Sequence, residues 1–417
     1  MTESQSPIDT LERAYAAIPR PGSPSWTEVA ARFIGVPDDV VRSFIESFLI
    51  VPLVSAVSNL PEFSQGLSYS LRYPGGERAM DAALAATMLF RFVNAGGTMH
   101  NGLDALREAT RPRDVHGQFV MVVAGINISS AADVTEMIRL VPFNDLPRTP
   151  SWNDAARYAG ATLLPHGMST LPLPLAALVA RVTVSDPVAT TATSGSYVTV
   201  GASSEIRSTL EEIRLALTCV GPSRPVSVVE WFEFVDPLLS HLNSPGGMSM
   251  TYDDLRHGYP WMEVQHESAD MAAVARQYSQ LADGGTRARL ARALRRLNFA
   301  MRRADVGDRA VELAIALESV LVGGRGENTF KVSLRASLII PADRARRIAA
   351  RAIVSAIYDV RSAVVHSGEA ANKVRVRGRG EVSTATVVNE GLVITADVLR
   401  QLIGRGAIPV WEDLEVP

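Results

Sequence analysis

The chain has little cysteine, no long apolar run and no leader-like start. Its single cysteine, Cys219, excludes an internal disulfide and any cysteine-cluster metal site. Cys219 ends an apolar helical pattern, which favours a structural role. The longest apolar run, residues 48–57, contains a proline and is shorter than the roughly 18 residues that span a membrane. The first ten residues are polar and acidic, unlike a signal peptide. We therefore expect a soluble, cytoplasmic protein that does not bind membranes.

Lysine is also scarce, because only Lys331 and Lys373 among the 41 basic residues are lysine. The net charge of -3 conceals an asymmetry along the chain. Residues 285–380 contain 20 Lys and Arg against 8 Asp and Glu, a balance of +12, and the remainder stands at -15. A basic segment of this kind favours a polyanionic partner. Arginine-rich helix faces that are merely solvated would give the same count.

At 417 residues the chain is long enough for two or three domains. Residues 1–117 are expected to be mostly helical, with amphipathic stretches near 8–18, 26–33, 38–57 and 76–93. Residues 118–267 are expected to mix helices and short strands, with strands near 119–123, 178–184, 197–200 and 226–234 and a helix over 203–217. These two regions form an α+β part and a candidate sensor or regulatory domain.

The pattern of residues 268–417 indicates helices alone. Helices are expected near 271–282, 286–303, 308–322 and 331–340, joined by short turns that are typical of an all-α bundle. A longer helix is expected from Pro341 to His366, about 26 residues or roughly 39 Å. Its expected apolar positions are Ile348, Ile353, Ile357, Val360 and Val364.

Arg361 and His366 lie near the end of this longer helix and are separated by four residues. Histidine can transfer protons near neutral pH, and the permanently charged arginine can hold a phosphate. Five steps along a regular helix turn about 140° and rise about 7.5 Å. Gly368 predicts that the helix ends just after His366, where unwinding would let the two side chains converge.

Chance also supplies such pairs, because arginine is abundant in this chain. A second pair with the same spacing occurs at Arg111 and His116. Pro112 follows its arginine directly and disfavours helical backbone there, which predicts a loop. Only Arg361 and His366 therefore remain as candidates for a catalytic pair.

Four blocks of the C-terminal region occur in a recognisable order. They are DRAVELAIALESVL, which contains Asp308 and Glu318, FKVSLRASLI at 330–339, IYDVRSAVVHSG at 357–368 and VLRQLIGRGAIPVWEDL at 398–414. Together they resemble the HEPN superfamily, and within it the Apea-like HEPN branch, over about residues 291–414. Several ordered blocks are more specific than one short motif.

The resemblance implies a four- to five-helix bundle that forms a homodimer, with two Arg-x4-His motifs facing each other across a cleft. Such proteins are commonly metal-independent ribonucleases without a cofactor that act in antiviral defence against phage or as toxins. By this analogy His366 is the acid/base and Arg361 binds phosphate. Glu318 and Asp359 match acidic positions of the family and would orient the motif, or form a packing ion pair. Arg335 is expected to contact an acid on a neighbouring helix.

The chemistry of RNA cleavage gives a separate reason for a dimer. Attack by the 2′-hydroxyl requires a general base, and departure of the 5′-oxygen requires a general acid. One histidine per motif cannot readily do both, whereas two chains can. Active members often carry Asn, Asp or His directly after the motif arginine, but this chain has Ser362. The alternative is a non-catalytic HEPN module that binds RNA or a partner protein.

A basic segment follows the motif. Lys373, Arg375, Arg377 and Arg379 alternate with small or apolar residues, so an extended chain would place the four cations on one side, ready for RNA phosphates. The segment has no aromatic residue for base stacking, and sequence-specific reading is not expected. A solvated loop between two helices would show the same pattern.

Overall fold

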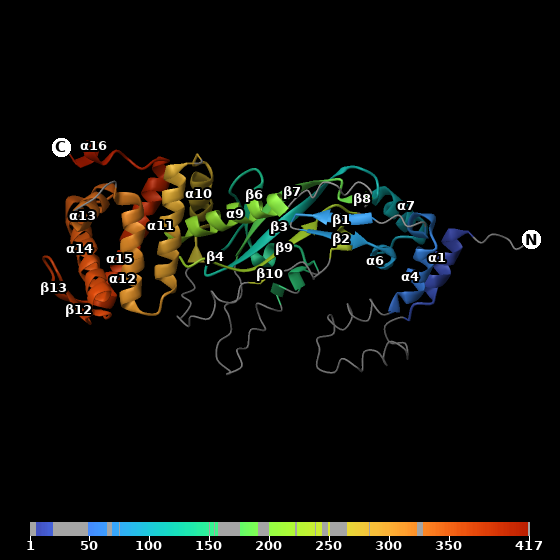
Figure 1. Ribbon diagram of the computed structural model, residues 1–417, viewed down its shortest axis with the longest axis horizontal. Coiled ribbons are helices and arrows are strands. Elements are labelled where there is room, and N and C mark those ends of the chain that lie inside the picture. Colours follow the sequence, from blue (N-terminus) through green and yellow to red (C-terminus); the bar gives the residue numbers. More distant parts are fainter. Residues whose placement is uncertain are drawn as a thin grey trace, which may run out of the picture. The chain divides into compact units, whose positions relative to one another are not determined.

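The computed structural model describes residues 6–19, 49–64, 69–74, 76–149, 151–153, 155–156, 176–190, 200–221, 223–237, 239–243, 249–250, 265–282, 284–322 and 328–415. The chain, traced in Figure 1, divides into two compact units. The first comprises residues 1–118, 181–205 and 232–247, and the second comprises 119–180, 206–231 and 248–417. The helix expected over 26–33 and most of the strand expected over 197–200 lie outside the described residues.

The first unit packs helices and a small sheet around one apolar core. Its helices are α1 (Pro7–Ala16), α4 (Val51–Ser58), α5 (Pro61–Ser64), α6 (Ala82–Asn94) and α7 (Met99–Ala109). Capping side chains start three of them, because the Ser6 hydroxyl oxygen accepts from the Ile8 N–H at 3.2 Å, the Asp81 carboxylate from the Leu84 N–H at 2.9 Å and the Thr98 hydroxyl oxygen from the Asn101 N–H at 3.2 Å. The fully buried core residues include Leu11, Leu53, Met88 and Leu89.

A three-stranded antiparallel sheet belongs to the same unit. β1 (Tyr69–Tyr73) lies between β2 (Gly76–Met80) and β8 (Val188–Thr190). The prediction of a helix over 76–93 is therefore wrong for residues 76–80, whereas α6 confirms most of the remainder. Cross-strand pairing stabilises such short strands, and one partner of β1 is more than a hundred residues away.

A six-stranded sheet contains the predicted strands of the middle region. Its order is β10-β9-β3-β7-β6-β5, with β3 (Asp114–Ala124), β5 (Ala132–Asp133), β6 (Ile138–Pro142), β7 (Ala176–Ser185), β9 (Val226–Phe234) and β10 (Ser249–Met250). β3, β7 and β9 confirm the strands expected over 119–123, 178–184 and 226–234. The helix expected over 203–217 is α9 (Val200–Ala216), so Val200 is helical and not part of a strand.

The second unit also buries Cys219. Cys219 ends the 3-10 helix η4 (Leu217–Cys219) and is only 2% exposed. Burial raises the pKa of its thiol far above the ordinary value. A thiol in this state is a poor nucleophile, in keeping with the structural role expected for it.

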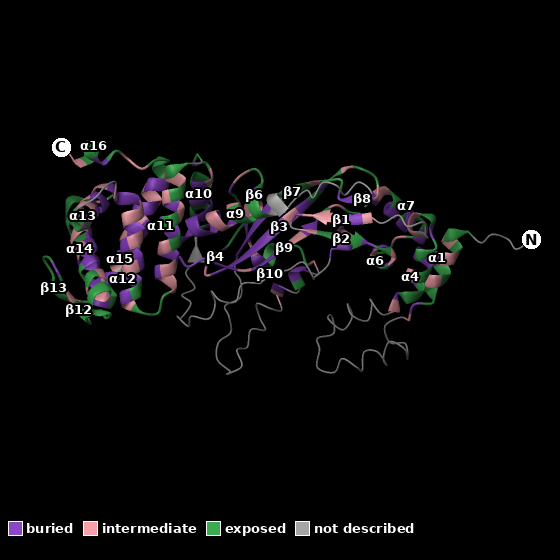
Figure 2. Cartoon of the chain, viewed as in Figure 1, coloured by how far each residue is buried: buried purple, intermediate pink, exposed green. Residues whose placement is uncertain are grey.

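The C-terminal part of the second unit is a set of packed helices. They are α10 (Ser268–Ser279), α11 (Gly285–Arg302), α12 (Val306–Leu321), α13 (Asn328–Ile339), α14 (Arg344–Ser367), α15 (Thr384–Arg405) and the short α16 (Trp411–Glu415). Figure 1 shows α11, α12, α14 and α15 side by side, and their facing sides are coloured as buried in Figure 2. None of the described helices is both long and apolar enough to cross a membrane.

Two glycines let these helices approach closely. A Cβ on Gly391 of α15 would lie 2.2 Å from Ile357 Cδ1 of α14. A Cβ on Gly307, in the first turn of α12, would lie 2.7 Å from Val364 Cγ2 of α14. The start of α12 therefore packs on the end of α14, so the two helices run antiparallel.

Two expectations for this region are wrong. The long helix starts at Arg344, after Asp343 caps it by accepting from the Arg346 N–H at 2.8 Å, and Pro341 lies in the preceding loop. The first turn and a half of this helix is exposed, and Ile348, one of its expected apolar positions, is 62% exposed. In addition, the region is not purely helical, because β12 (Lys373–Val376) and β13 (Gly380–Ser383) form an antiparallel hairpin between α14 and α15.

Candidate functional site

His366 lies exposed in the last turn of α14. The helix ends because Gly368 adopts left-handed backbone, with φ of 82°, and its N–H donates to the Val364 carbonyl at 2.9 Å. The Ser367 hydroxyl also donates to the Ala363 carbonyl at 2.6 Å. The imidazole is thus carried by a well-capped helix end and is open to solvent.

Arg361 lies in a different environment, between α14 and α12. One turn before it on α14, the buried Tyr358 donates its hydroxyl to Glu318 Oε1 of α12 at 3.1 Å. Burial and the charge of Glu318 raise the pKa of the Tyr358 phenol, and the nearby charge of Arg361 opposes this rise. Glu318, Tyr358 and the half-buried Arg361 therefore form one cluster across the helix pair.

The two motif side chains do not converge on one chain. We expected the helix to unwind near His366, just before Gly368. Instead α14 stays helical through Ser367. On such a helix Arg361 and His366 point about 140° apart. His366 instead shares an exposed stripe with Asp359 and Ser362, which precede it by seven and four residues.

Asp359 differs from an ordinary surface acid although its side chain is exposed. The surrounding helix surface removes enough water to raise the pKa of its carboxyl above the ordinary value. Glu318 and Asp359 were expected to support one site. Instead Glu318, on α12, contacts the side of α14 that carries Tyr358, whereas Asp359 lies on the exposed side of α14. Glu318 belongs with Arg361, and Asp359 belongs with His366.

The four cations after the motif lie on and beside the hairpin and do not form one free row. Arg379 makes a two-pronged ion pair with Glu390 of α15, at 2.7 and 3.0 Å. Lys373 lies 3.9 Å from Glu381 on β13. Arg375 and Arg377 are exposed and have no ion pair within the described part of the chain. They are the two cations of this segment that remain available to a phosphate.

Arg335 of α13 confirms its expected contact with an acid. Its guanidinium is buried and donates to Glu415 Oε1 of α16 at 2.6 Å and to the Leu321 carbonyl at 2.7 Å. It also lies over the Trp411 ring, 5.2 Å from the centroid. These contacts attach α16 to α13 and give Arg335 a structural role.

The competing pair at Arg111 and His116 is divided between two elements, as Pro112 predicted. Arg111 lies just beyond the end of α7 and pairs with Glu108 at 2.5 Å. His116 lies on β3, with its Nδ1 3.4 Å from the Thr183 hydroxyl. No helix carries both residues.

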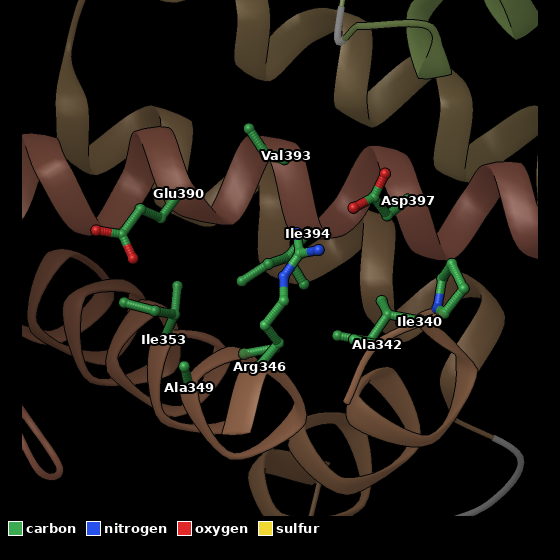
Figure 3. A pocket seen from close by; sticks show the side chains of 11 residues that line it. Ile340, Ala342, Arg346, Ala349, Ile353, Glu390, Val393, Ile394 and Asp397 are labelled. Atoms are coloured by element: carbon green, nitrogen blue, oxygen red, sulfur yellow. The ribbon is translucent and has the colours of Figure 1, made fainter. Parts of the chain in front are cut away.

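A groove of about 260 Å³ separates the first half of α14 from α15. Its walls are mostly apolar, and Figure 3 shows Arg346 reaching from α14 toward α15, with Glu390 and Asp397 on the opposite wall. Burial raises the pKa of the Asp397 carboxyl, against the opposing charges of Arg346 and Arg400. The sequence pattern did not indicate this groove.

Tyr358 was also missed by sequence reasoning, although its place one turn before Arg361 on the apolar side of the helix was a usable signal.

The described residues contain no group of three or more His, Cys, Asp or Glu side chains placed to hold a metal ion. Comparison of the chain with protein-family models, with curated proteins and with solved structures found no match.

Proposed function

We propose that the C-terminal region, residues 268–417, is a metal-independent endoribonuclease of the HEPN type. The observation that carries the proposal is the exposed His366 on a rigid helix end, next to a hairpin with two available arginines. A solvent-exposed imidazole beside cations is what proton transfer on a phosphodiester requires. In the cell the enzyme would act in the cytoplasm, in defence against phage or as an RNA-cleaving toxin.

In this reaction the 2′-hydroxyl of RNA attacks its own phosphorus, and the bond to the 5′-oxygen breaks. One His366 accepts the proton of the hydroxyl, and a second His366 donates a proton to the leaving oxygen. Arg361 stabilises the charge of the phosphorane, and the Tyr358 and Glu318 pair supports the position of Arg361. Because Arg361 and His366 diverge on one chain, the proposal requires a homodimer whose chains share the site.

The remaining site residues have supporting roles in the proposal. Asp359 and Ser362 share the stripe of His366 and would orient its imidazole. Arg375 and Arg377 would hold RNA phosphates next to the site, with Lys373 and Arg379 as weaker contributors because both face carboxylates. The first unit would receive the trigger or regulatory partner.

A second function is favoured by one observation, the divergence of Arg361 and His366 on a regular helix. If no second chain completes the site, the region is a non-catalytic module that binds RNA or a partner protein. The two functions differ in whether bound RNA is cut.

The test is incubation of the purified chain with RNA in EDTA. We expect cleavage to survive chelation and to fall by about 100-fold or more in His366→Ala, the usual size of an acid/base contribution. His116→Ala is the matched control, since it removes an exposed histidine from the competing pair and is expected to leave cleavage unchanged. RNA that is bound but not cut, or cut equally by His366→Ala, would contradict the nuclease.

A further inference from the structure

Helix α11 has an unusually one-sided charge. Its 18 residues include six arginines and no carboxylate, and Arg303 follows directly. Cations repel one another along a helix, so acceptors on other elements or an external anion would stabilise such a composition. The contacts of these arginines separate the two cases.

Most of the α11 arginines have partners within the second unit. Arg287 pairs with Glu212 at 2.9 Å. Arg289 donates to the carbonyls of Ser319, Val320 and Val322 at the end of α12, at 2.8 to 3.1 Å. These two side chains hold the helices together and need no further partner.

Arg296 and Arg303 share one acid. Both approach Glu312 of α12, at 3.0 and 3.5 Å, so one carboxylate faces two guanidinium groups. Arg303 remains exposed at the end of α11. This pair therefore retains an excess positive charge.

Arg292 and Arg295 are different, because both are exposed and neither has an ion pair within the described ranges. Arg295 is near enough to Glu211 to help lower the pKa of that carboxyl, but Glu211 is bound by Arg214, whose Nε lies 2.7 Å from it. Arg292, Arg295 and Arg303 recur at helical spacing along one side of α11, over about 16 Å.

This stripe leads toward the proposed site. α11 and α12 are joined by a short turn after Arg303, and Gly307 at the start of α12 packs on Val364 of α14. His366 lies two residues beyond Val364. The Arg303 end of the stripe and the proposed site are therefore at the same end of the bundle.

We propose that Arg292, Arg295 and Arg303 form a track that binds the phosphate backbone of RNA and guides it toward His366. The inference rests on the proposed function for its ligand. Exposed guanidinium groups in a row suit a polyanion with regularly repeated charges, and here Arg303 shares its acid with Arg296 while the other two have no ion pair among the described residues. Such binding is independent of base sequence. An acidic protein surface is the competing occupant, and it would leave RNA binding independent of these residues.

The test compares two double variants of the full chain. Arg292→Gln/Arg295→Gln removes two charges from the track. Arg344→Gln/Arg347→Gln removes two exposed charges from the first turn of α14, about 29–33 Å along that helix from His366. Binding of a fluorescent single-stranded 20-mer RNA is measured by anisotropy between about 50 and 200 mM salt.

We expect the track variant to bind more weakly and its slope of log affinity against log salt to fall by about 1.4, which is about 0.7 for each lost phosphate contact. The α14 variant should keep the wild-type slope. An unchanged slope in the track variant, or equal losses in both variants, would overturn the track. Circular dichroism checks that both variants remain folded.

Cleavage of the same RNA separates the two proposals. If the wild type binds RNA through the track but never cuts it, the nuclease fails and the track stands. If the track variant cuts and binds like the wild type, the track fails and the nuclease stands. A wild type that neither binds nor cuts RNA overturns both.

Discussion

Arg361 and His366 have different surroundings although only four residues separate them. Arg361 is half-buried beside Tyr358 and Glu318, whereas His366 is exposed beside Ser362. A half-buried guanidinium suits charge stabilisation, and an exposed imidazole suits proton transfer. In the proposed ribonuclease, the two residues would therefore carry out these two tasks from different faces of α14.

Asp397 gives a residue-scale prediction about pH. Burial in the groove raises the pKa of its carboxyl above 3.8, its ordinary value, so the folded state disfavours the ionised form. This destabilisation is absent below the unfolded-state pKa and develops as pH rises through the folded-state pKa. Asp397→Asn should therefore unfold at higher urea concentration than the wild type at pH 7, and the difference should shrink toward pH 3.8.

Glu390→Gln is the control for this prediction, because Glu390 lines the same groove but pairs with Arg379. We expect this variant to be neutral or up to about 1 kcal/mol less stable, the range for surface ion pairs. A wild type more stable than Asp397→Asn at pH 7 would mean that the Arg346 attraction outweighs burial.

For single residues, the sequence predicted the kind of contact more often than the residue that is contacted. The local pattern SLRAS indicated that Arg335 contacts an acid, but not that the acid is Glu415, eighty positions away. Ile348 fits the apolar spacing of α14 and is nevertheless exposed, because none of the described elements covers its side chain. Apolar periodicity identifies one face of a helix, but the tertiary arrangement decides whether another element covers that face.

At the scale of elements, helix ends were predictable where capping residues were unambiguous. Gly368 marks the end of α14 as expected, and Asp305 caps α12, which starts two residues before the expected start at residue 308. Pro341 failed as a start because Asp343, two residues later, caps the helix with its own side chain. The hairpin β1–β2 was missed because its strands are short and pair with a distant third strand.

The contact between α14 and α15 gives the element-scale prediction. Gly391→Ala places a Cβ 2.2 Å from Ile357 Cδ1 in a buried position, so the helices must separate or Ile357 must change rotamer. We expect a net loss of about 1–2 kcal/mol in unfolding free energy, since overpacking outweighs the gain in helix propensity. Urea denaturation followed by circular dichroism measures the loss.

Gly404→Ala in the same helix is its matched control. There a Cβ would meet only Gln277 Oε1, at an ordinary 3.6 Å. This variant should be unchanged or up to about 1 kcal/mol more stable, because alanine favours the helix. If Gly391→Ala and Gly404→Ala change the stability equally, α14 and α15 can move apart without loss of stability.

For the whole molecule, the composition change near residue 268 marks where the succession of long helices begins. It does not mark the two compact units, because most of their boundaries fall within β3, β7, α9 and β9. Strands from distant parts of the sequence join one sheet, and local composition contains no record of that pairing. For the same reason, the proposed shared site depends on a second chain that the sequence of one chain cannot specify.

The two-chain site makes a prediction about mixed dimers. A dimer purified through two different tags, with one wild-type chain and one His366→Ala chain, retains a single motif histidine. If one His366 is the base and the other the acid, cleavage of RNA should fall by about 100-fold relative to the wild-type dimer, not by half. A dimer with one His116→Ala chain should cleave at the full rate.

Retention of half the activity would mean that each motif works within its own chain. That result would be difficult to reconcile with α14, whose regular backbone through Ser367 directs Arg361 and His366 to different sides. A monomer in solution that cuts RNA would contradict the shared site more directly. In that case His366 would have to act with Asp359 and Ser362 on its own stripe, and Asp359→Asn would then abolish cleavage while Arg361→Ala would spare it.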